Sequence, residues 1–305
     1  MLYTLENDLL KISVNSLGAE LWHIICNQTG TDYLWQGREC IANFNNDARP
    51  LPESTPLFWQ GRSPILFPIV GRLKNGTCNY YGKKMNIDLH GFAQTNEFDV
   101  ASEPGKLIFS LKDNPVTRQI YPFEFMLKVI FTLENNRLCT EYCVSNTSDT
   151  VDLVFGIGGH PGFVLPHTQF SDYFLEFENC SHISSTVVSP NGLLEDDTSR
   201  IDLIDSRLPL SYELFSKYDT ILLVDTPVKK VSLKSMQHKN GITVGFDAEH
   251  LAIWAQQGAP FVCLEPWDGL PDFESTCGDF AKKVGNHILP PGASKTFTNY
   301  ITIGI

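Results

Sequence analysis

Phe123–Glu134 reads FEFMLKVIFTLE, and in this stretch every odd-numbered position is apolar while the even-numbered positions are mostly polar. Side chains on a β-strand alternate between two faces, so this spacing predicts a strand with one face in a hydrophobic core. Asn135 and Asn136 follow, and Arg137–Asn146 then resumes a strand-like composition. Asparagine tolerates positive φ, so two asparagines between two such stretches predict a tight β-hairpin.

Short stretches of the same kind recur along the chain, separated by turn-forming residues such as NQTG at 27–30 and PPG at 290–292. No convincing helical periodicity of ten residues or more is present, and only the segment near Tyr212–Lys217 is expected to form a turn or two of helix. Strands at this density predict an all-β fold, a large antiparallel β-sandwich, and we expect one domain over residues 1–305. The further strand-like stretches are Leu9–Val14, Glu20–Cys26, Leu107–Leu111, Tyr173–Phe177, Lys230–Lys234, Ile242–Phe246, Leu251–Ala255 and Thr296–Ile303.

The least regular segment is Gln36–Arg62, which is rich in Asn, Pro, Arg and Trp. A loop of this length is uncommon in a compact domain and is often functional. It would then shape the rim of a binding pocket. A surface insertion that covers a sheet edge is the alternative interpretation.

Composition and charge exclude several classes of function. The chain has 305 residues, 42% hydrophobic and 19% charged, which is ordinary for a globular enzyme. The net charge of −12 argues against a nucleic-acid partner, since nucleic-acid binding depends mainly on a basic surface. The N-terminal sequence MLYTLEND has no secretory pattern. The sequence contains no run of about 18 apolar residues, so no membrane span is expected. The 8 cysteines form no CxxC pair and are expected to be reduced and buried, so we expect a cytoplasmic protein.

Two of the 8 histidines lie in a context that favours chemistry. His90 begins the segment HGFA and His160 lies in GGHPG, so each has glycines beside it that allow close approach of a ligand to the backbone. Imidazole titrates near neutral pH and can serve as a general acid or as a neutral hydrogen-bond partner. An isolated histidine is more often structural or solvated, and the other histidines lack a context that changes that interpretation.

Glu265 follows the apolar run FVCL and precedes Pro266. A carboxylate at the mouth of a buried strand is partly desolvated, which raises its pKa and makes it a stronger base. A glutamate that caps a loop or pairs with a basic residue is the structural alternative. Glu265, His160 and His90 are therefore candidate catalytic residues, provided that the fold brings them together.

Three further residues are candidates for binding a sugar. Arg72 ends the run PILFPIVGR, and its guanidinium offers several donors to hydroxyl oxygens, although a structural salt bridge is an equal alternative. Asp219 precedes the apolar residues ILL and is placed to accept hydrogen bonds from sugar hydroxyls. Trp267 could present a flat apolar face to a sugar ring, or it could simply pack in the core.

Local spacing argues against a zinc site and against several motif-based classes of enzyme. The histidines show no HxH or HExxH spacing and the cysteines show no paired spacing, so a metal would need ligands from distant parts of the chain. Neither GxGxxG nor GxxxxGK[ST] is present, and there is no GxSxG nucleophile motif. These absences remove several large classes of enzyme.

Four segments, taken in their order, resemble the aldose 1-epimerase (galactose mutarotase) family, in particular its LacX-like and YeaD-like branch. They are ILFPIVGR at 65–72, HGFA at 90–93, GHPGF at 159–163 and EPWDG at 265–269. Each segment alone is only moderately specific, but the resemblance covers nearly the whole chain. It implies a β-supersandwich fold and an enzyme without a cofactor.

The resemblance also implies a division of roles. Glu265 would act as the general base that takes the proton from the C1 hydroxyl, and His160 would act as the general acid that protonates the ring oxygen. The ring would open to the free aldehyde, and rotation about C1–C2 followed by reclosure would give the other anomer. His90 would position and polarise the sugar, while Arg72 and Asp219 would hold its hydroxyls.

Gln94 departs from part of this family. Members that act on hexose 6-phosphates carry arginine shortly after the HGFA segment, where this chain has Gln94. Loss of a charge-assisted phosphate contact costs about 1.5–3 kcal/mol, and the acidic net charge adds repulsion. We therefore place Gln94 among the candidate substrate-binding residues and expect an unphosphorylated aldose.

Three functions from different classes remain open. The first is a mutarotase, an isomerase that acts on a small-molecule sugar as a monomer or homodimer. The second is a carbohydrate-binding or regulatory protein without turnover, which is disfavoured because binding alone needs no matched acid and base. The third is a glycoside hydrolase or lyase, in which Asp268 or Asp272 would supply a second carboxylate beside Glu265.

Overall fold

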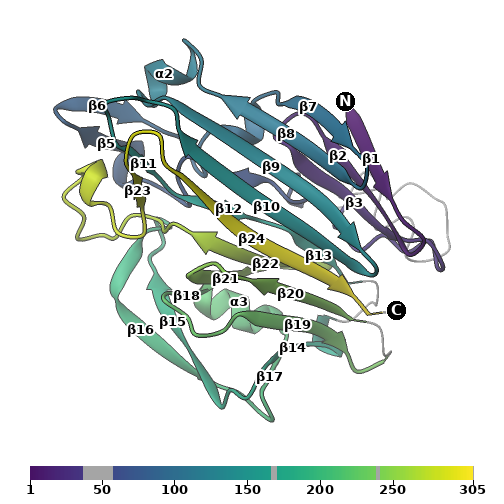
Figure 1. The fold of residues 1–305 in the computed structure, drawn as a ribbon. Coiled ribbons are helices and arrows are strands. Elements are labelled where there is room, and N and C mark those ends of the chain that lie inside the picture. The colour runs from purple at the N-terminus through teal and green to yellow at the C-terminus, as the bar shows by residue number, and fades with distance from the viewer. Residues whose placement is uncertain (37–57, 166–169, 238–240, 305) are drawn as a thin grey trace.

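The largest sheet of the protein contains the hairpin predicted from its alternating sequence. The computed structural model describes residues 1–36, 58–165, 170–237 and 241–304. Within them, a nine-stranded sheet of antiparallel neighbours runs from β7 at the top of Figure 1 through β24 to β17 at the bottom. Its strands, in spatial order, are β17 (Arg207–Pro209), β14 (Tyr173–Phe177), β19 (Lys230–Ser235), β20 (Ile242–Phe246), β24 (Ser294–Ile303), β10 (Arg137–Asn146), β9 (Phe125–Glu134), β8 (Lys106–Lys112) and β7 (Asp99–Glu103).

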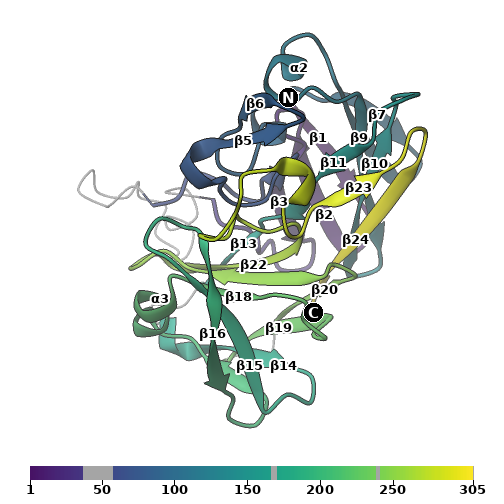
Figure 2. The ribbon, with the colours of Figure 1, turned by 90° about the vertical axis from the view of Figure 1, so that its left-hand side faces the viewer.

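A second antiparallel sheet carries the candidate catalytic glutamate. Figure 2 shows β22 and β18 of this sheet crossing the middle of the molecule, with the β15–β16 hairpin extending below them. The strands, in spatial order, are β16 (Leu194–Asp202), β15 (His182–Val188), β18 (Thr220–Leu223), β21 (His250–Trp254), β22 (Phe261–Asp268), β12 (Ile157–Gly159) and β4 (Ile65–Leu66), and β13 (Gly162–Val164) pairs with β22 as well.

Smaller elements complete the fold. Three small sheets are formed by β1 (Leu2–Glu6), β2 (Leu10–Asn15) and β3 (Glu20–Cys26), by β5 (Thr77–Tyr80) and β6 (Lys83–Asn86), and by β11 (Leu153–Phe155) and β23 (His287–Leu289). The short helices are α2 (Thr117–Ile120), α3 (Tyr212–Tyr218), η1 (Lys74–Gly76), η2 (Ala93–Thr95), η3 (Phe170–Asp172) and η4 (Phe280–Lys282). In the part of the chain that the structure describes, no helix is long and apolar enough to span a membrane.

The predicted hairpin is confirmed, and its turn differs in detail from the expectation. Glu134 pairs with Arg137, which leaves a two-residue loop. Asn135 has φ 54°, whereas Asn136 is not among the described residues with positive φ. A positive φ at the first central position alone is the pattern of a type II′ turn, so only one of the two asparagines uses its tolerance of that conformation.

The all-β prediction is confirmed. The further strand-like stretches all correspond to strands with ends shifted by two residues or fewer, and α3 forms over the segment expected to be helical. The Ser211 hydroxyl caps α3 by accepting a hydrogen bond from the N–H of Leu214. The β15–β16 hairpin was missed because most of β16 is exposed on both faces, so its sequence lacks apolar alternation.

An aromatic core links the two large sheets and anchors the segment that leads to Arg72. The ring centroid of Phe67 lies 5.1 Å from that of Phe125, 6.2 Å from that of Tyr121 and 6.0 Å from that of Phe155. All four side chains are fully buried, and burial of each contributes about 1.5–3 kcal/mol. These residues belong to one hydrophobic cluster that draws on both sheets. The cluster supports the prediction of a single domain over residues 1–305, which stays a prediction.

The cysteines depart in part from the expectation. The described cysteines are free thiols, and Cys26, Cys78 and Cys263 are buried as predicted. Cys277, in contrast, is exposed.

Candidate active site

Glu265 lies inside strand β22, between β21 on one side and β12 and β13 on the other. All eight residues of β22 are buried, which explains why its sequence is a nearly continuous apolar run instead of an alternating one. The sequence predicted that Glu265 lies at the end of the buried strand, just before Pro266. This prediction is wrong, because β22 continues through Pro266 to Asp268. The side chain is only 1% exposed, and its carboxyl group is therefore more strongly desolvated than expected.

His160 lies in the connection between β12 and β13, directly beside Glu265. Its N–H donates to the carbonyl of Pro64 at 3.1 Å, and the N–H of Leu264 donates to the carbonyl of Pro161 at 3.2 Å. These bonds hold the connection against β4 and β22. His160 Nε2 then lies 3.2 Å from Glu265 Oε2, so the fold brings together these two residues from distant parts of the chain.

His90 is held by the segment that ends in Arg72. Its N–H donates to the carbonyl of Gly71 at 2.9 Å, and the N–H of Gly71 donates to His90 Nδ1 at 3.1 Å. Because Nδ1 accepts, the neutral ring has its proton on Nε2. The ring stands edge-on to that of His160, with centroids 5.5 Å apart and planes at 87°. All three candidate catalytic residues are thus neighbours.

Gly91 allows the turn that presents His90. His90 and Gly91 have φ values of 65° and 75°, and a Cβ at position 91 would collide with the carbonyl oxygen of Phe67. That oxygen accepts hydrogen bonds from the N–H of Phe92 at 2.9 Å and of Ala93 at 3.1 Å. The glycine of the HGFA segment is therefore required by close packing of two backbone segments.

Burial sets the protonation of all three residues. It raises the pKa of Glu265 well above its ordinary value, and the nearby Trp267 side chain opposes this effect. Burial, followed by repulsion from His90, lowers the pKa of His160 well below its ordinary value. Burial and then the charge of Arg72 lower the pKa of His90 from 6.5 to about 4. The uncharged forms of Glu265 and His160 are therefore favoured in the free protein.

We expect the contribution of His90 to the stability of the protein to decrease as the pH falls from 6.5 to 4. Because the pKa of His90 is about 4 in the folded state and 6.5 when unfolded, the unfolded chain binds more protons in this range. The ring is partly exposed, so the loss is expected to be about 1–3 kcal/mol, less than the full linkage of about 1.4 kcal/mol per pH unit.

Urea denaturation at several pH values tests this expectation, with His90→Asn as the matched variant. Asparagine tolerates positive φ and can place an acceptor near the N–H of Gly71, but it does not titrate. Its stability should depend less on pH than that of the unsubstituted protein. Equal slopes for the two proteins would contradict the role of His90.

Aromatic side chains that the sequence analysis did not single out enclose His160. The ring of Trp59 stacks on the imidazole with centroids 4.7 Å apart and planes at 26°, and Trp254 meets it edge-on at 5.9 Å. Trp59 comes from the irregular segment Gln36–Arg62, of which residues 37–57 lie outside the described residues. The described end of that segment therefore contributes to the site, in line with a role in shaping it.

Gly162 provides the space for Trp59. A Cβ at this position would lie 2.8 Å from Trp59 Cζ3 and 3.4 Å from Cys263 Sγ. We expect Gly162→Ala to destabilise the protein by about 1–3 kcal/mol, the usual cost of overpacking, and to alter tryptophan fluorescence. Gly245→Ala is the control, since a Cβ there meets no atom closer than 3.9 Å. Equal unfolding temperatures for the two variants would show that Trp59 can move aside without loss of stability.

Arg72 is exposed at the surface, close enough to His90 for its charge to act on that ring. Its carbonyl accepts a hydrogen bond from the N–H of Asp272 at 2.8 Å, which fixes the backbone. The guanidinium makes no ion pair with any described residue, and its charge contributes to lowering the pKa of His90. A structural salt bridge, the alternative role considered from the sequence, is thus not found in the described part of the chain.

A buried ion pair supports the backbone of Arg72. Lys283 Nζ lies 2.9 Å from Asp272 Oδ1, and both side chains are 3% exposed. The same Nζ donates to the carbonyl of Leu270 at 2.6 Å, and Asp272 Oδ2 accepts from the N–H of Lys74 at 2.8 Å. Asp272 thus clamps the backbone on both sides of Leu73, directly after Arg72.

The structure gives less direct support to the three remaining candidates for sugar binding, Asp219, Gln94 and Trp267. Asp219 is the exposed C-terminal cap of α3 and precedes Thr220, the residue that pairs with Trp254. Gln94 donates its side-chain N–H to the carbonyl of Leu89 at 3.2 Å. Trp267 is only 5% exposed and packs in a hydrophobic cluster, which favours the packing alternative over a sugar platform. The binding roles of these residues stay predictions.

Among the described residues, the two aspartates considered for the hydrolase alternative are both engaged elsewhere. Asp268 Oδ1 faces His287 Nε2 at 3.5 Å, and Asp272 is engaged by Lys283. Paired carboxylates across a glycosidic bond are the usual requirement of hydrolases. Neither aspartate is free for that role.

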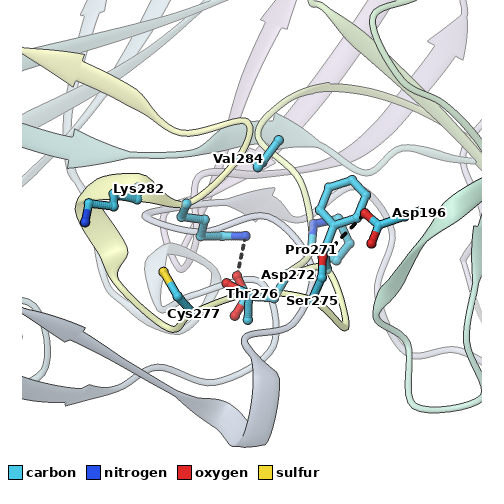
Figure 3. Close-up of a pocket in the computed structure, with 10 residues that line it drawn as sticks. Asp196, Pro271, Asp272, Ser275, Thr276, Cys277, Lys282 and Val284 are labelled. Carbon is cyan, nitrogen blue, oxygen red and sulfur yellow. Dashed lines mark hydrogen bonds and ion pairs between the residues drawn. The ribbon is translucent and has the colours of Figure 1, made fainter.

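A separate cavity of about 330 Å³ is lined by Asp272 and nearby residues. Figure 3 shows Ser275 facing Asp196 at one end, with Cys277 and Lys282 at the other. None of the candidate site residues lines it, so we assign it no part in the chemistry of Glu265 and His160.

Comparison with known proteins identifies the family to which a chain with this fold belongs. The sequence matches the family model described as aldose 1-epimerase over residues 1–301, so the chain belongs to the aldose 1-epimerase family. It is 31% identical over 283 residues to the plasmid-encoded protein LacX of Lactococcus lactis subsp. lactis, with 88% of each sequence covered.

Solved structures give the same result. The chain is similar to a galactose mutarotase related enzyme from Lactobacillus acidophilus, with 33% identity, a TM-score of 0.87 and coverage of 99% of this chain and 97% of that one. It is also similar to a galactose mutarotase-like protein from Lactobacillus casei ATCC 334, with 28% identity, a TM-score of 0.87 and coverage of 99% and 100%. The resemblance drawn from the four sequence segments is confirmed.

Proposed function

We propose that this protein is an aldose 1-epimerase that interconverts the α and β anomers of an unphosphorylated aldose. The observation that carries the proposal is the approach of His160 Nε2 to within 3.2 Å of Glu265 Oε2 in a buried setting. Ring opening needs one group that accepts a proton and one that donates a proton, both close to C1 and the ring oxygen. Membership of the aldose 1-epimerase family supports this chemistry.

In the proposed reaction the pair holds one proton at every stage. The ionised Glu265 takes the proton of the C1 hydroxyl, and protonated His160 gives its proton to the ring oxygen as the bond between C1 and that oxygen breaks. C1 becomes an aldehyde carbon, and the proton of the pair now resides on Glu265. Rotation about C1–C2 and the reverse transfers give the other anomer.

The electrostatics of the site support this proton exchange. Burial favours neutral Glu265 and neutral His160, which is the state of the pair while the open-chain sugar is bound. The ionised pair that starts ring opening is disfavoured by the same burial, so the proton transfers of ring opening return the pair to its favoured neutral state. Neither state requires a proton from solvent.

We infer the binding roles from position. His90, with its proton on Nε2, is proposed to donate to a sugar oxygen, and Arg72 and Asp219 are proposed to hold hydroxyl groups. The side chain of Gln94 turns back to a backbone carbonyl and offers no positive charge, which supports an unphosphorylated substrate. A monomeric or homodimeric cytoplasmic enzyme stays a prediction.

Polarimetry of freshly dissolved α-glucose and α-galactose tests the function. Purified protein should accelerate the drift of optical rotation toward equilibrium, and glucose 6-phosphate should be a substrate at least tenfold poorer in kcat/KM, in line with the missing charge-assisted contact. If calorimetry detects sugar binding but no simple aldose is accelerated, the carbohydrate-binding alternative is correct and the proposal is wrong.

A further inference from the structure

Cys263 completes a cluster that local sequence spacing does not reveal. It lies two residues before Glu265 on β22, so both side chains point to the same face of the sheet. The connection between β12 and β13 places His160 over this face. Ligand-capable atoms of His160, Cys263 and Glu265 all lie within 4.8 Å of one another.

We propose that His160 Nε2, Cys263 Sγ and a carboxylate oxygen of Glu265 form a binding site for a soft divalent cation, with Zn²⁺ as the best fit, and that the bound ion inhibits the enzyme. Thiolate, imidazole and carboxylate are the ligands that Zn²⁺ takes in proteins. Three protein ligands leave a fourth position open to water.

The distances fit a tetrahedral ion. With Zn–N and Zn–O bonds of about 2.0–2.2 Å, the nitrogen and oxygen ligands of a tetrahedral site lie about 3.3 Å apart. The observed separation of His160 Nε2 from Glu265 Oε2 is 3.2 Å. A Zn–S bond of about 2.3 Å places sulfur about 3.5 Å from the other ligands. Since the atoms lie within 4.8 Å of one another, Sγ needs to approach each of them by about 1.3 Å at most.

The site also contains polar atoms that lack a partner. Glu265 Oε2 is buried, and its 3.2 Å approach to His160 Nε2 does not have the geometry of a hydrogen bond, so the oxygen makes no hydrogen bond to any described residue. A buried polar atom without a partner is costly, and a cation would satisfy it. Once the ion has displaced their protons, Cys263 and Glu265 supply two negative charges, which balance a divalent cation in this desolvated setting.

Binding is expected to be reversible. His160 Nδ1 is buried and has no hydrogen-bond partner among the described residues. Metal-binding histidines of tight sites usually donate from their other ring nitrogen to a supporting group. The absence of that support in the described part of the chain indicates an inhibitory site of moderate affinity instead of a structural one.

Two other groups of potential ligands among the described residues fit a metal less well. The first group consists of Glu249, Asp268 and His287. Lys295 Nζ lies 3.1 Å from His287 Nδ1 and adds a positive charge to this group. The ring proton of His287 is then on Nε2, the nitrogen that faces Asp268. In the group of Asp225, Glu249 and His250, both carboxylates are exposed. The N–H of Asp225 occupies His250 Nδ1 at 3.0 Å.

Titration of the chelator-treated full-length protein with Co²⁺ tests the site without any sugar. We expect one equivalent of Co²⁺ to produce a thiolate-to-cobalt charge-transfer band and the strong visible absorption of a tetrahedral ion, and Zn²⁺ to abolish both. Cys263→Ala should remove the band. Cys78→Ala is the matched control, because Cys78 is also buried and lies near a carboxylate but has Lys283 in place of an imidazole.

A missing band in the unsubstituted protein, or a band that persists in Cys263→Ala, would overturn the site. If circular dichroism shows that Cys263→Ala does not fold, His160→Gln replaces it, since the thiol is retained. Co²⁺ affinity should then fall by more than the ten- to hundredfold that is typical of losing a supporting residue. Unchanged affinity would overturn the site as well.

The inhibition rests on the proposed function and is measured separately. An ion held by Glu265 and His160 removes both the base and the acid, so Zn²⁺ should abolish mutarotation at concentrations that saturate the site. Full activity with the site saturated would overturn the inhibition. If the band forms but the protein accelerates no aldose, the metal site stands and the proposed function fails.

Discussion

Replacing Glu265 by glutamine is expected to slow mutarotation at least a hundredfold, within the range of about 10² to 10⁴ that positioned acids and bases contribute. Glutamine keeps the volume of the side chain but cannot take the proton of the C1 hydroxyl. Stability should change little, because burial already favours the uncharged form of Glu265. Polarimetry measures the rate, and thermal unfolding measures the stability.

Glu141→Gln is the matched control, since Glu141 lies on β10 in the other large sheet and makes no contact with His160 among the described residues. Its rate should equal that of the unsubstituted protein. His160→Ala should also lose at least a hundredfold in rate, with some loss of stability because the stacked contact with Trp59 disappears. A Glu265→Gln variant with the original rate would show that the assignment of the base is wrong.

Replacing Lys283 by methionine is expected to lower the free energy of unfolding by about 3–5 kcal/mol. Methionine fills most of the space of the lysine stem but leaves the carboxylate of Asp272 buried without its positive partner. Asp272 and Lys283 are each 3% exposed, so water compensates little for the lost ion pair. Urea denaturation measures the change.

The neighbouring residue supplies the control for this prediction. Lys282 is 76% exposed and pairs with Asp279 at the surface, so Lys282→Met should cost no more than about 1 kcal/mol. The double variant Asp272→Asn with Lys283→Met should lose less than the sum of the single variants, because no buried charge is left unpaired. A loss below about 1 kcal/mol for Lys283→Met would contradict the importance of the pair.

Lys283→Met is also expected to affect sugar binding. Asp272 holds the carbonyl of Arg72 through its N–H, and loss of its partner should loosen this backbone. In the proposed function Arg72 binds hydroxyl groups and transfers no proton. We therefore expect KM to rise more than kcat falls.

The strands could be predicted wherever one face is buried and the other is solvated. Phe123–Glu134 shows this alternation because β9 has its odd-numbered side chains in the core, and in Arg137–Asn146 it is β10 that has its even-numbered side chains there. The exposed β16 lacks the pattern, and the fully buried β22 replaces it with a continuous apolar run. Periodicity thus detects a strand through the contrast between its faces and fails where that contrast is absent.

The site was predictable only in part. His90, His160 and Glu265 stand out because glycine, proline or an apolar run flanks them. Trp59 and Cys263 have no such local signal. Their proximity to His160 follows from the pairing of β13 with β22 and from the missing side chain at Gly162. The same is true of Lys283 and Asp272, which meet across a turn that periodicity does not describe.

The sequence by itself determined the all-β class and the family, and it singled out Glu265 and His160 as candidates, since these depend on the pattern of residue types along the chain. Only the tertiary structure decided that Glu265 Oε2 and His160 Nε2 lie 3.2 Å apart, that both are buried and that Cys263 is beside them. Protonation and metal affinity depend on desolvation and on the distances between groups. Those quantities arise when strands distant in sequence pair and exclude water from the space between them.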